Sequence, residues 1–121
     1  MITSKDNEKI KLIRKLENKK ARRETGFFLL EGKRLVNEAL KRGAAVEVFT
    51  TQGANFPGGT LLSDAVFAGV SDTVNSQGVL ALCRIPKYEP VYEGCCLILD
   101  RVRDPGNLGA IIRTAAAAEI G

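Results

Sequence analysis

The stretch Leu97-Ile-Leu-Asp-Arg-Val-Arg-Asp104-Pro-Gly-Asn107-Leu-Gly-Ala-Ile-Ile-Arg113 carries the clearest structural signal in this 121-residue chain. Cys95 to Leu99 is an unbroken apolar run, which is typical of a strand buried on both faces. Leu108 to Ile120 is rich in Ala and Ile over a helical length. The stretch therefore predicts the first strand-loop-helix unit of an α/β sheet. Because ligands of such sheets gather beyond the carboxyl ends of the strands, the polar residues from Asp100 to Asn107 are candidates for chemistry.

Asn107 and Arg113 are the candidate site residues of this stretch. At the entry to the predicted helix, Asn107 can accept a hydrogen bond from a free backbone N–H of the first turn. Arg113 lies roughly 9 Å further along the axis, at about 1.5 Å per residue. An isolated Asn in such a place is often only a helix cap, and an isolated Arg is often only a solvent-facing residue. The spacing alone leaves both interpretations open.

The whole string resembles the first motif of the SpoU (TrmH-like) RNA ribose 2′-O-methyltransferases, which belong to the SPOUT class and carry a C-terminal trefoil knot. The resemblance rests on the Asp104-Pro-Gly-Asn107 core and on its neighbours from Leu97 to Ala117. It implies that Asn107 and Arg113 are catalytic and that Arg113 helps to activate the ribose 2′-hydroxyl. It also implies S-adenosylmethionine as the cofactor of the whole enzyme, and homodimers formed through the knotted domain.

The family pattern continues after Gly121 with two further motifs and the knot that binds the cofactor, and none of these occurs in this sequence. One strand and one helix are also too little to bury the apolar residues between Leu97 and Ile120. We therefore expect the chain to be part of a longer enzyme. By itself it is expected neither to bind S-adenosylmethionine nor to methylate RNA.

Positive charge is concentrated in the N-terminal third of the chain. Residues 1–42 hold 13 Lys and Arg against 6 Asp and Glu, whereas residues 43–100 hold 2 against 6. A basic cluster beside an acidic body is typical of nucleic-acid binders, because each neutralised phosphate releases counterions. A charge run is equally often a solvated helix face, so composition alone leaves both interpretations open.

Composition excludes several classes of protein. The chain has no His and only three Cys, without a Cys-x-x-Cys pair, so we expect no metal site, no disulfide framework and no triad hydrolase. No apolar run approaches the ~20 residues of a membrane span, and the Lys-rich N-terminus lacks a signal-peptide apolar region. We expect a cytoplasmic protein without membrane contact.

The first 84 residues predict a small α/β sandwich of the order β-α-β-(β)-α-β, preceded by an amphipathic helix. Ser4 or Asp6 caps this first helix, which ends between Asn18 and Lys20, and a basic loop follows from Lys19 to Gly26. The remaining predicted elements are a strand at Phe27–Leu30, a helix from Lys33 to Arg42 that buries Leu35, Val36, Ala39 and Leu40, a strand at Val46–Thr50, a loop at 52–59, a brief strand at Leu61–Leu62, a helix capped by Asp64 through Val70, and a strand at Gly78–Arg84.

This N-terminal half also resembles the substrate-binding domain that precedes the knot in many SpoU-type enzymes, a fold similar to small RNA-binding ribosomal proteins. The resemblance rests on Gly26 to Leu40 and on Ser71 to Ala81. In both segments a glycine lies beside polar or basic residues, and the helix after Gly32 offers free N–H groups that suit a phosphate. The alternative is that Gly32 and Gly78 are turn residues and that Gln77 is an ordinary surface residue. The predicted RNA-binding residues are Lys19, Lys20, Arg22, Arg23, Gly32, Lys33, Arg34, Gln77 and Gly78.

The predicted domains are therefore an RNA substrate-binding domain at 1–84, a linker at 85–94 and the incomplete start of a SPOUT methyltransferase domain at 95–121. The predicted function is the N-terminal part of an enzyme that methylates rRNA or tRNA. The main alternative is a non-enzymatic RNA-binding protein of the small ribosomal type, with residues 85–121 as a tail. A dinucleotide-binding protein would need Gly-x-Gly-x-x-Gly after the first strand, where this loop has only Gly106 and Gly109.

Overall fold

A computed structural model describes residues 1–87 and 93–120. The chain divides into two compact units, unit 1 from Met1 to Pro86 and unit 2 from Lys87 to Gly121. Half of the predicted linker at 85–94 lies outside the described residues. Within the described part of the chain, no helix is both long and apolar enough to cross a membrane.

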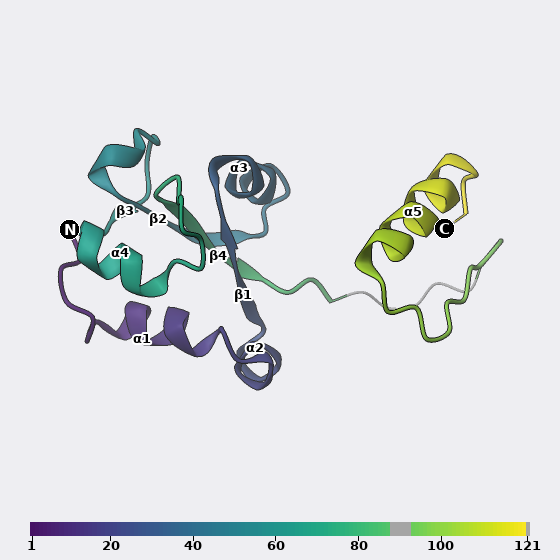
Figure 1. Cartoon of the computed structure of the whole chain (residues 1–121), viewed down its shortest axis with the longest axis horizontal. Helices are drawn as coiled ribbons and strands as arrows, with labels where there is room; N and C mark the ends of the chain where they lie inside the picture. Colours follow the sequence, from purple (N-terminus) through teal and green to yellow (C-terminus); the bar gives the residue numbers. More distant parts are fainter. Residues whose placement is uncertain (88–92, 121) are drawn as a thin grey trace. The chain divides into compact units, whose positions relative to one another are not determined.

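Unit 1 is built on a mixed sheet with the strand order β1-β4-β2-β3. The strands are β1 (Phe27–Glu31), β2 (Ala45–Thr50), β3 (Thr60–Leu61) and β4 (Val79–Arg84). The last strand, β4, runs antiparallel to both β1 and β2, and β3 adds to β2 in parallel. One side of β4 pairs with β1, which leaves the other edge of β1 without a partner strand in the described sheet (Figure 1).

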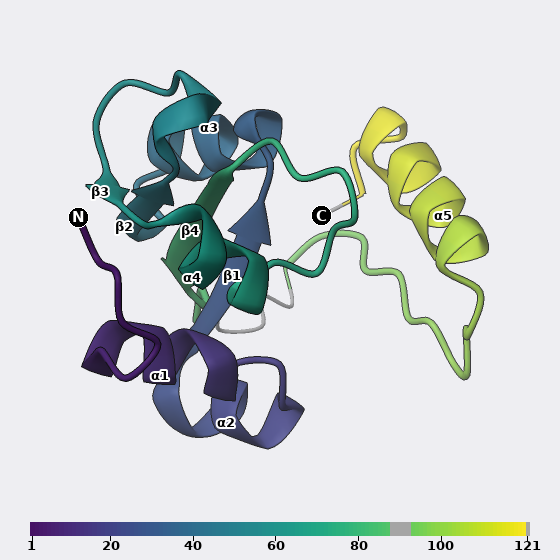
Figure 2. The same ribbon diagram turned by 60° about the vertical axis from the view of Figure 1, so that its left-hand side comes forward.

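Helices cover both faces of this sheet (Figures 1 and 2). On one face, α3 (Lys33–Lys41) packs Val36 and Ala39 against β4. On the other face, α1 (Glu8–Lys15) and α4 (Asp64–Val70) enclose the larger core, which includes Phe49 and Leu80. The alternating pattern of β4 supplies both cores, since neighbouring residues of a strand point to opposite faces. The predicted α/β sandwich is confirmed for this unit.

The buried face of α3 is narrower than predicted. Val36 and Ala39 are buried, whereas Leu35 and Leu40 are 50% and 48% exposed. At 3.6 residues per turn, Leu35 and Leu40 flank the Val36–Ala39 stripe on its two sides, so both leucines lie at the margins of the contact with the sheet. The prediction that all four residues are buried was therefore wrong for the two leucines.

Helix ends differ from the prediction at several places. Asn7, rather than Ser4 or Asp6, caps α1 by accepting a hydrogen bond from the N–H of Lys9 at 2.9 Å. The predicted basic loop is a helix, α2 (Lys19–Thr25), which Asn18 caps. Ser63, rather than Asp64, caps α4. Each of these caps is a short polar side chain immediately before the helix, where its oxygen reaches an unpaired N–H.

Unit 2 contains one helix in its described part, α5 (Pro105–Ala117). The strand predicted at 95–99 is not formed, and Leu97, Ile98 and Leu99 are exposed, Ile98 by 89%. An apolar run becomes a strand only when another strand accepts its hydrogen bonds, and the described residues of unit 2 contain no second strand. The predicted β-α unit is therefore represented here by its helix alone.

Candidate functional site

The two predicted glycine segments, at 32–34 and 77–78, meet at the N-terminus of α3. Gly32 is the N-cap residue of α3 and has no side chain to cap it. Gln77 supplies the cap, because its Oε1 accepts a hydrogen bond from the N–H of Lys33 at 2.7 Å. The sequence suggested that the N–H groups at the start of this helix are free for a phosphate. The Lys33 N–H is not free, because it donates to Gln77. Gln77 joins the loop before β4 to the helix after β1.

Gly78 is in close contact with the protein itself. Its φ of +74° is rarely adopted by residues with a side chain, and a Cβ added there would collide with Thr51 Oγ1 and lie 3.1 Å from Ala54 Cβ. The Gly78 carbonyl also accepts a hydrogen bond from the N–H of Thr51 at 3.0 Å. The space beside Gly78 is therefore taken by Thr51, which sequence reasoning did not single out.

Glu31 organises the loop between α4 and β4. Both of its carboxylate oxygens accept from the Ser71 hydroxyl at 2.9 Å, and Oε1 also accepts from the N–H of Asp72 at 3.3 Å. Burial acts to raise the pKa of Glu31, but hydrogen bonds from Thr73, Ser71 and Ser76 side chains and from the Asp72 backbone outweigh it and hold that pKa below its usual value. An ionised Glu31 thus fixes the loop that carries Gln77.

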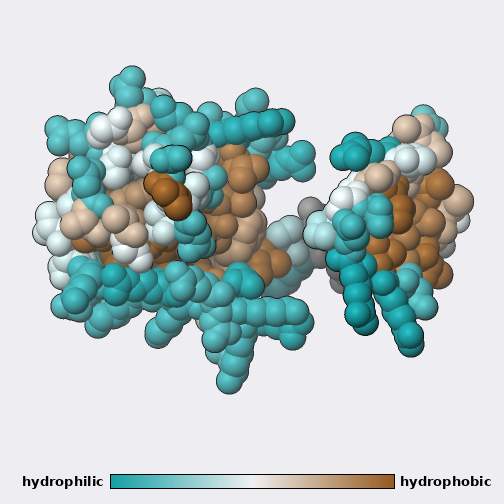
Figure 3. All heavy atoms as spheres, viewed as in Figure 1, coloured by the Kyte–Doolittle hydropathy of each residue, from teal (hydrophilic) through white to brown (hydrophobic). Residues whose placement is uncertain are grey.

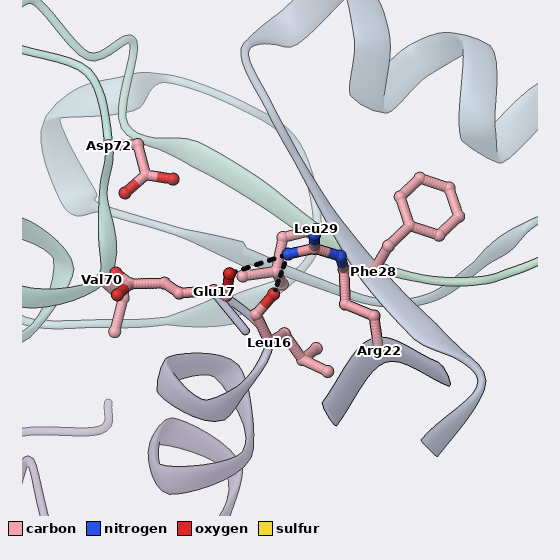
Figure 4. Close-up of a pocket in the computed structure, with 7 residues that line it drawn as sticks. All are labelled: Leu16, Glu17, Arg22, Phe28, Leu29, Val70 and Asp72. Atoms are coloured by element: carbon pink, nitrogen blue, oxygen red, sulfur yellow. Dashed lines mark hydrogen bonds between the residues drawn. The ribbon is translucent and has the colours of Figure 1, made fainter. Parts of the chain in front are cut away.

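The predicted basic residues of α2 have different surroundings. Arg22 is half-buried, and its Nη1 donates to the carbonyls of Leu16 at 2.8 Å and Glu17 at 2.9 Å, which closes the C-terminal end of α1 (Figure 4). Lys20 pairs with Glu24 at 3.8 Å. Lys19 and Arg23 have no ion pair or side-chain hydrogen bond to any described residue. These two are the cations of α2 that are free for a ligand.

Lys33 and Arg34 likewise have side chains without an ion pair or hydrogen bond in the described part of the chain. They begin α3, directly after the C-terminal end of β1, whereas α2 ends directly before the N-terminal end of β1. Five residues at about 3.3 Å each make β1 roughly 16 Å long. These four cations therefore form two groups, one on the helix before the open edge strand and one on the helix after it. Figure 3 shows the hydrophilic side chains that gather over the α1 and α2 side of the unit.

The structure places Asn107 and Arg113 on α5 of unit 2. Asp104, rather than Asn107, is the N-cap, because its Oδ1 accepts from the N–H of Gly106 at 2.7 Å and of Asn107 at 3.4 Å. The alternative in which Asn107 is only a helix cap is thus not what the structure shows, and the Asn107 side chain is exposed in the first turn. Arg113 extends back along the helix, with Nη1 3.8 Å from where a Cβ of Gly109 would lie. Neither side chain is held by another described residue.

Unit 2 also has an apolar groove of about 380 Å³, which is lined by side chains of α5 and of the residues before and after this helix. Its lining residues are Leu97, Ala110, Ile111, Thr114, Ala115, Ala118 and Ile120. Thr114, its only polar side chain among the described residues, already donates its hydroxyl to the Ala110 carbonyl at 3.0 Å. S-adenosylmethionine has ribose hydroxyls and a charged amino acid portion, which need polar partners. This groove therefore does not fit the cofactor.

Comparison with known proteins decides the family. Residues 7–81 match the family described as the MRM3-like substrate binding domain. The chain belongs to this family. Over 125 aligned residues it is 38% identical to the 23S rRNA (guanosine(2553)-2′-O)-methyltransferase RlmP of Bacillus subtilis, covering 97% of this chain and 50% of that protein. The chain thus spans about half the length of this relative.

Solved structures agree with this assignment. An AdoMet-bound rRNA methyltransferase from Sinorhizobium meliloti superposes with a TM-score of 0.68 at 35% identity, over 98% of this chain and 51% of that one. The SpoU methyltransferase AviRb from Streptomyces viridochromogenes shares the fold, with a TM-score of 0.63 at 23% identity over 94% of this chain and 51% of that one. The resemblance to the N-terminal substrate-binding region of SpoU-type RNA 2′-O-methyltransferases is confirmed.

Proposed function

We propose that this chain is the RNA-holding half of an S-adenosylmethionine-dependent rRNA 2′-O-methyltransferase. In this proposal residues 1–84 bind the RNA and residues 95–121 begin the methyltransferase domain. The observation that carries it is the arrangement of free cations at the two ends of edge strand β1, in a domain whose family is described as substrate-binding. An RNA segment that crosses this edge meets Lys19 and Arg23 at one end and Lys33 and Arg34 at the other.

The RNA is held mainly through its phosphates. Each cation that neutralises a phosphate releases condensed counterions, so affinity falls as salt concentration rises. Among the other predicted residues, Arg22 fixes α2 against α1, and Gln77 caps the start of α3 while Gly78 holds Thr51 beside it. Lys20 lies 3.8 Å from the Glu24 carboxylate, so its ammonium contributes to phosphate binding only when it leaves that partner.

Asn107 and Arg113 serve catalysis in the full-length enzyme. A ribose 2′-hydroxyl is a poor nucleophile near neutral pH, and a guanidinium lowers its pKa by stabilising the developing alkoxide while keeping its own charge. Arg113 is exposed and has no partner among the described residues, so it is available for this role. Asn107, in the first turn of α5, orients the loop before this helix and the ribose. The chain by itself binds no S-adenosylmethionine.

Salt-dependent binding of a hairpin rRNA fragment tests the RNA-binding proposal. In a variant with Lys19, Arg23 and Arg34 replaced by Ala, we expect weaker binding. In a plot of log affinity against log salt concentration, its slope should be shallower by about 2–3. A matched variant with Lys11, Lys41 and Arg42 replaced by Ala loses the same charge from residues that pair with Glu8 or Glu38. Equal slopes for the two variants would show that net charge, and not this surface, binds the RNA.

A further inference from the structure

A cavity of about 490 Å³ opens beside the edge strand, on the α1 and α4 face of the sheet. Its volume lies within the ~300–1,000 Å³ range of small-ligand pockets. The buried side chains of Leu16 and Val70 line its apolar part together with Leu29 of β1. Polar groups come from Arg22, Glu17 and Asp72 (Figure 4). The cavity thus offers both apolar side chains and hydrogen-bonding groups. A flat heterocycle needs both, because its faces are apolar and its edge carries donors and acceptors.

Arg22 supplies a fixed planar surface in this cavity. Its Nη1 is held by the carbonyls of Leu16 and Glu17 at the end of α1, so the guanidinium plane has little freedom to rotate (Figure 4). No other described group accepts from Nε or Nη2. Arg guanidinium planes are common stacking surfaces for unpaired RNA bases. Phe28 also lines the cavity, but its ring packs with the residues on the α3 face of the sheet, so Arg22 supplies the planar group that hydrogen bonds hold in place.

Two carboxylates make a phosphate an unfavourable occupant. Asp72 and Glu17 both line the cavity, and like charges repel a phosphate there. The Asp72 side chain has no ion pair or hydrogen bond to any described residue, while its backbone N–H is fixed on Glu31 at 3.3 Å. An ionised carboxylate only accepts hydrogen bonds. The cavity therefore favours a neutral ligand with N–H donors on one edge.

We propose that this cavity receives an unpaired guanine base of the bound RNA. Guanine presents N1–H and the N2 amino group side by side, so both can donate to the two oxygens of Asp72. Adenine, cytosine and uracil present an acceptor next to their donor on the same edge, and that acceptor would face a carboxylate oxygen. The base stacks on the Arg22 guanidinium, while the cations of α2 hold the neighbouring phosphates. This inference rests on the proposed RNA-binding function.

The test replaces guanosine by inosine, which lacks only the 2-amino group. Binding of the 121-residue chain is measured to an RNA hairpin with alternating guanosine and adenosine in its loop, and to the same hairpin with loop inosines. We expect the guanosine hairpin to bind about tenfold or more tightly, since one hydrogen bond to a charged group is lost. In Asp72→Asn this ratio falls to within twofold. The control Asp6→Asn makes the same charge change at an exposed residue outside the cavity and keeps the full ratio.

The outcomes separate this inference from the proposed function. Tight, salt-dependent binding with equal affinity for the guanosine and inosine hairpins would overturn the guanine site and leave the RNA-binding surface intact. An unchanged guanosine preference in Asp72→Asn would also overturn it, because the carboxylate would then not read the base. If neither hairpin binds, both proposals are wrong. Circular dichroism of Asp72→Asn confirms that a lost preference is not a lost fold.

Discussion

Replacing Gly78 by Ala tests the packing at the centre of the candidate site. An L-residue at a φ of +74° costs about 1–2 kcal/mol. The added Cβ also collides with Thr51 Oγ1 and lies 3.1 Å from Ala54 Cβ, and overpacking of this kind costs about 1–3 kcal/mol. The two effects together predict a loss of about 2–5 kcal/mol. For a domain of roughly 60–100 residues each kcal/mol lowers Tm by about 4–8 °C, so Tm falls by about 10 °C or more.

Two further variants separate backbone strain from collision. Gly43 has a similar φ of +68°, but nothing lies within 4 Å of a Cβ added there, so Gly43→Ala carries the backbone cost alone. We therefore expect Gly78→Ala to lower Tm clearly more than Gly43→Ala in thermal unfolding followed by circular dichroism. Adding Thr51→Ala to Gly78→Ala should recover part of the difference. If Gly78→Ala and Gly43→Ala lower Tm equally, the contact between Gly78 and Thr51 does not restrict this site.

Four other predictions address single groups. Gln77→Ala removes the cap of α3 and should lower the free energy of unfolding by about 0.5–2 kcal/mol in denaturant titrations, whereas Gln77→Glu, which keeps the acceptor, should retain most of it. The pKa of Glu31 is lower in the folded state than in the unfolded state, so its ionised carboxylate stabilises the fold above the unfolded pKa of about 4.3, and this stabilisation is lost as pH falls through the folded-state pKa. The difference in free energy of unfolding between the wild type and Glu31→Gln should therefore narrow over that pH range. A difference that stays constant with pH would contradict this. In the full-length enzyme, Arg113→Ala should slow single-turnover methylation by about 10²-fold or more without changing Tm, and a rate within twofold of normal would refute its catalytic role. Calorimetric titration of this chain with S-adenosylmethionine should show no saturable heat.

Sequence patterns predicted the elements whose signal is local. β1, β2 and β4 follow apolar or β-branched runs, and α3 follows a helical period that Gly43 ends. The helix α2 was missed because its residues are almost all polar, so no apolar stripe marked it, although Asn18 and Gly26 at its ends are helix-boundary residues. The run at 95–99 shows the opposite error, since strand propensity does not provide a partner strand.

The candidate site depends on contacts that no local pattern reveals. Gln77 and Lys33 are 44 residues apart, and sequence reasoning found both residues without their hydrogen bond. No local pattern assigned a role to Glu31, whose hydrogen bond from the Ser71 hydroxyl joins residues 40 positions apart. Charge patterning also treated the basic residues of α2 alike. Only the fold distinguishes Arg22, which closes α1, from Arg23, which is free to meet a ligand.

The sheet order has a consequence for how the protein folds during its synthesis. β4 is the last strand of unit 1 to be made, yet it is the only described strand that pairs with β1, and it also pairs along β2. A nascent chain that ends before Val79 can form helices, but β1 and β2 have no common partner. The apolar side chains of both strands then remain exposed until Arg84 has left the ribosome, so the domain folds late and in one step rather than element by element.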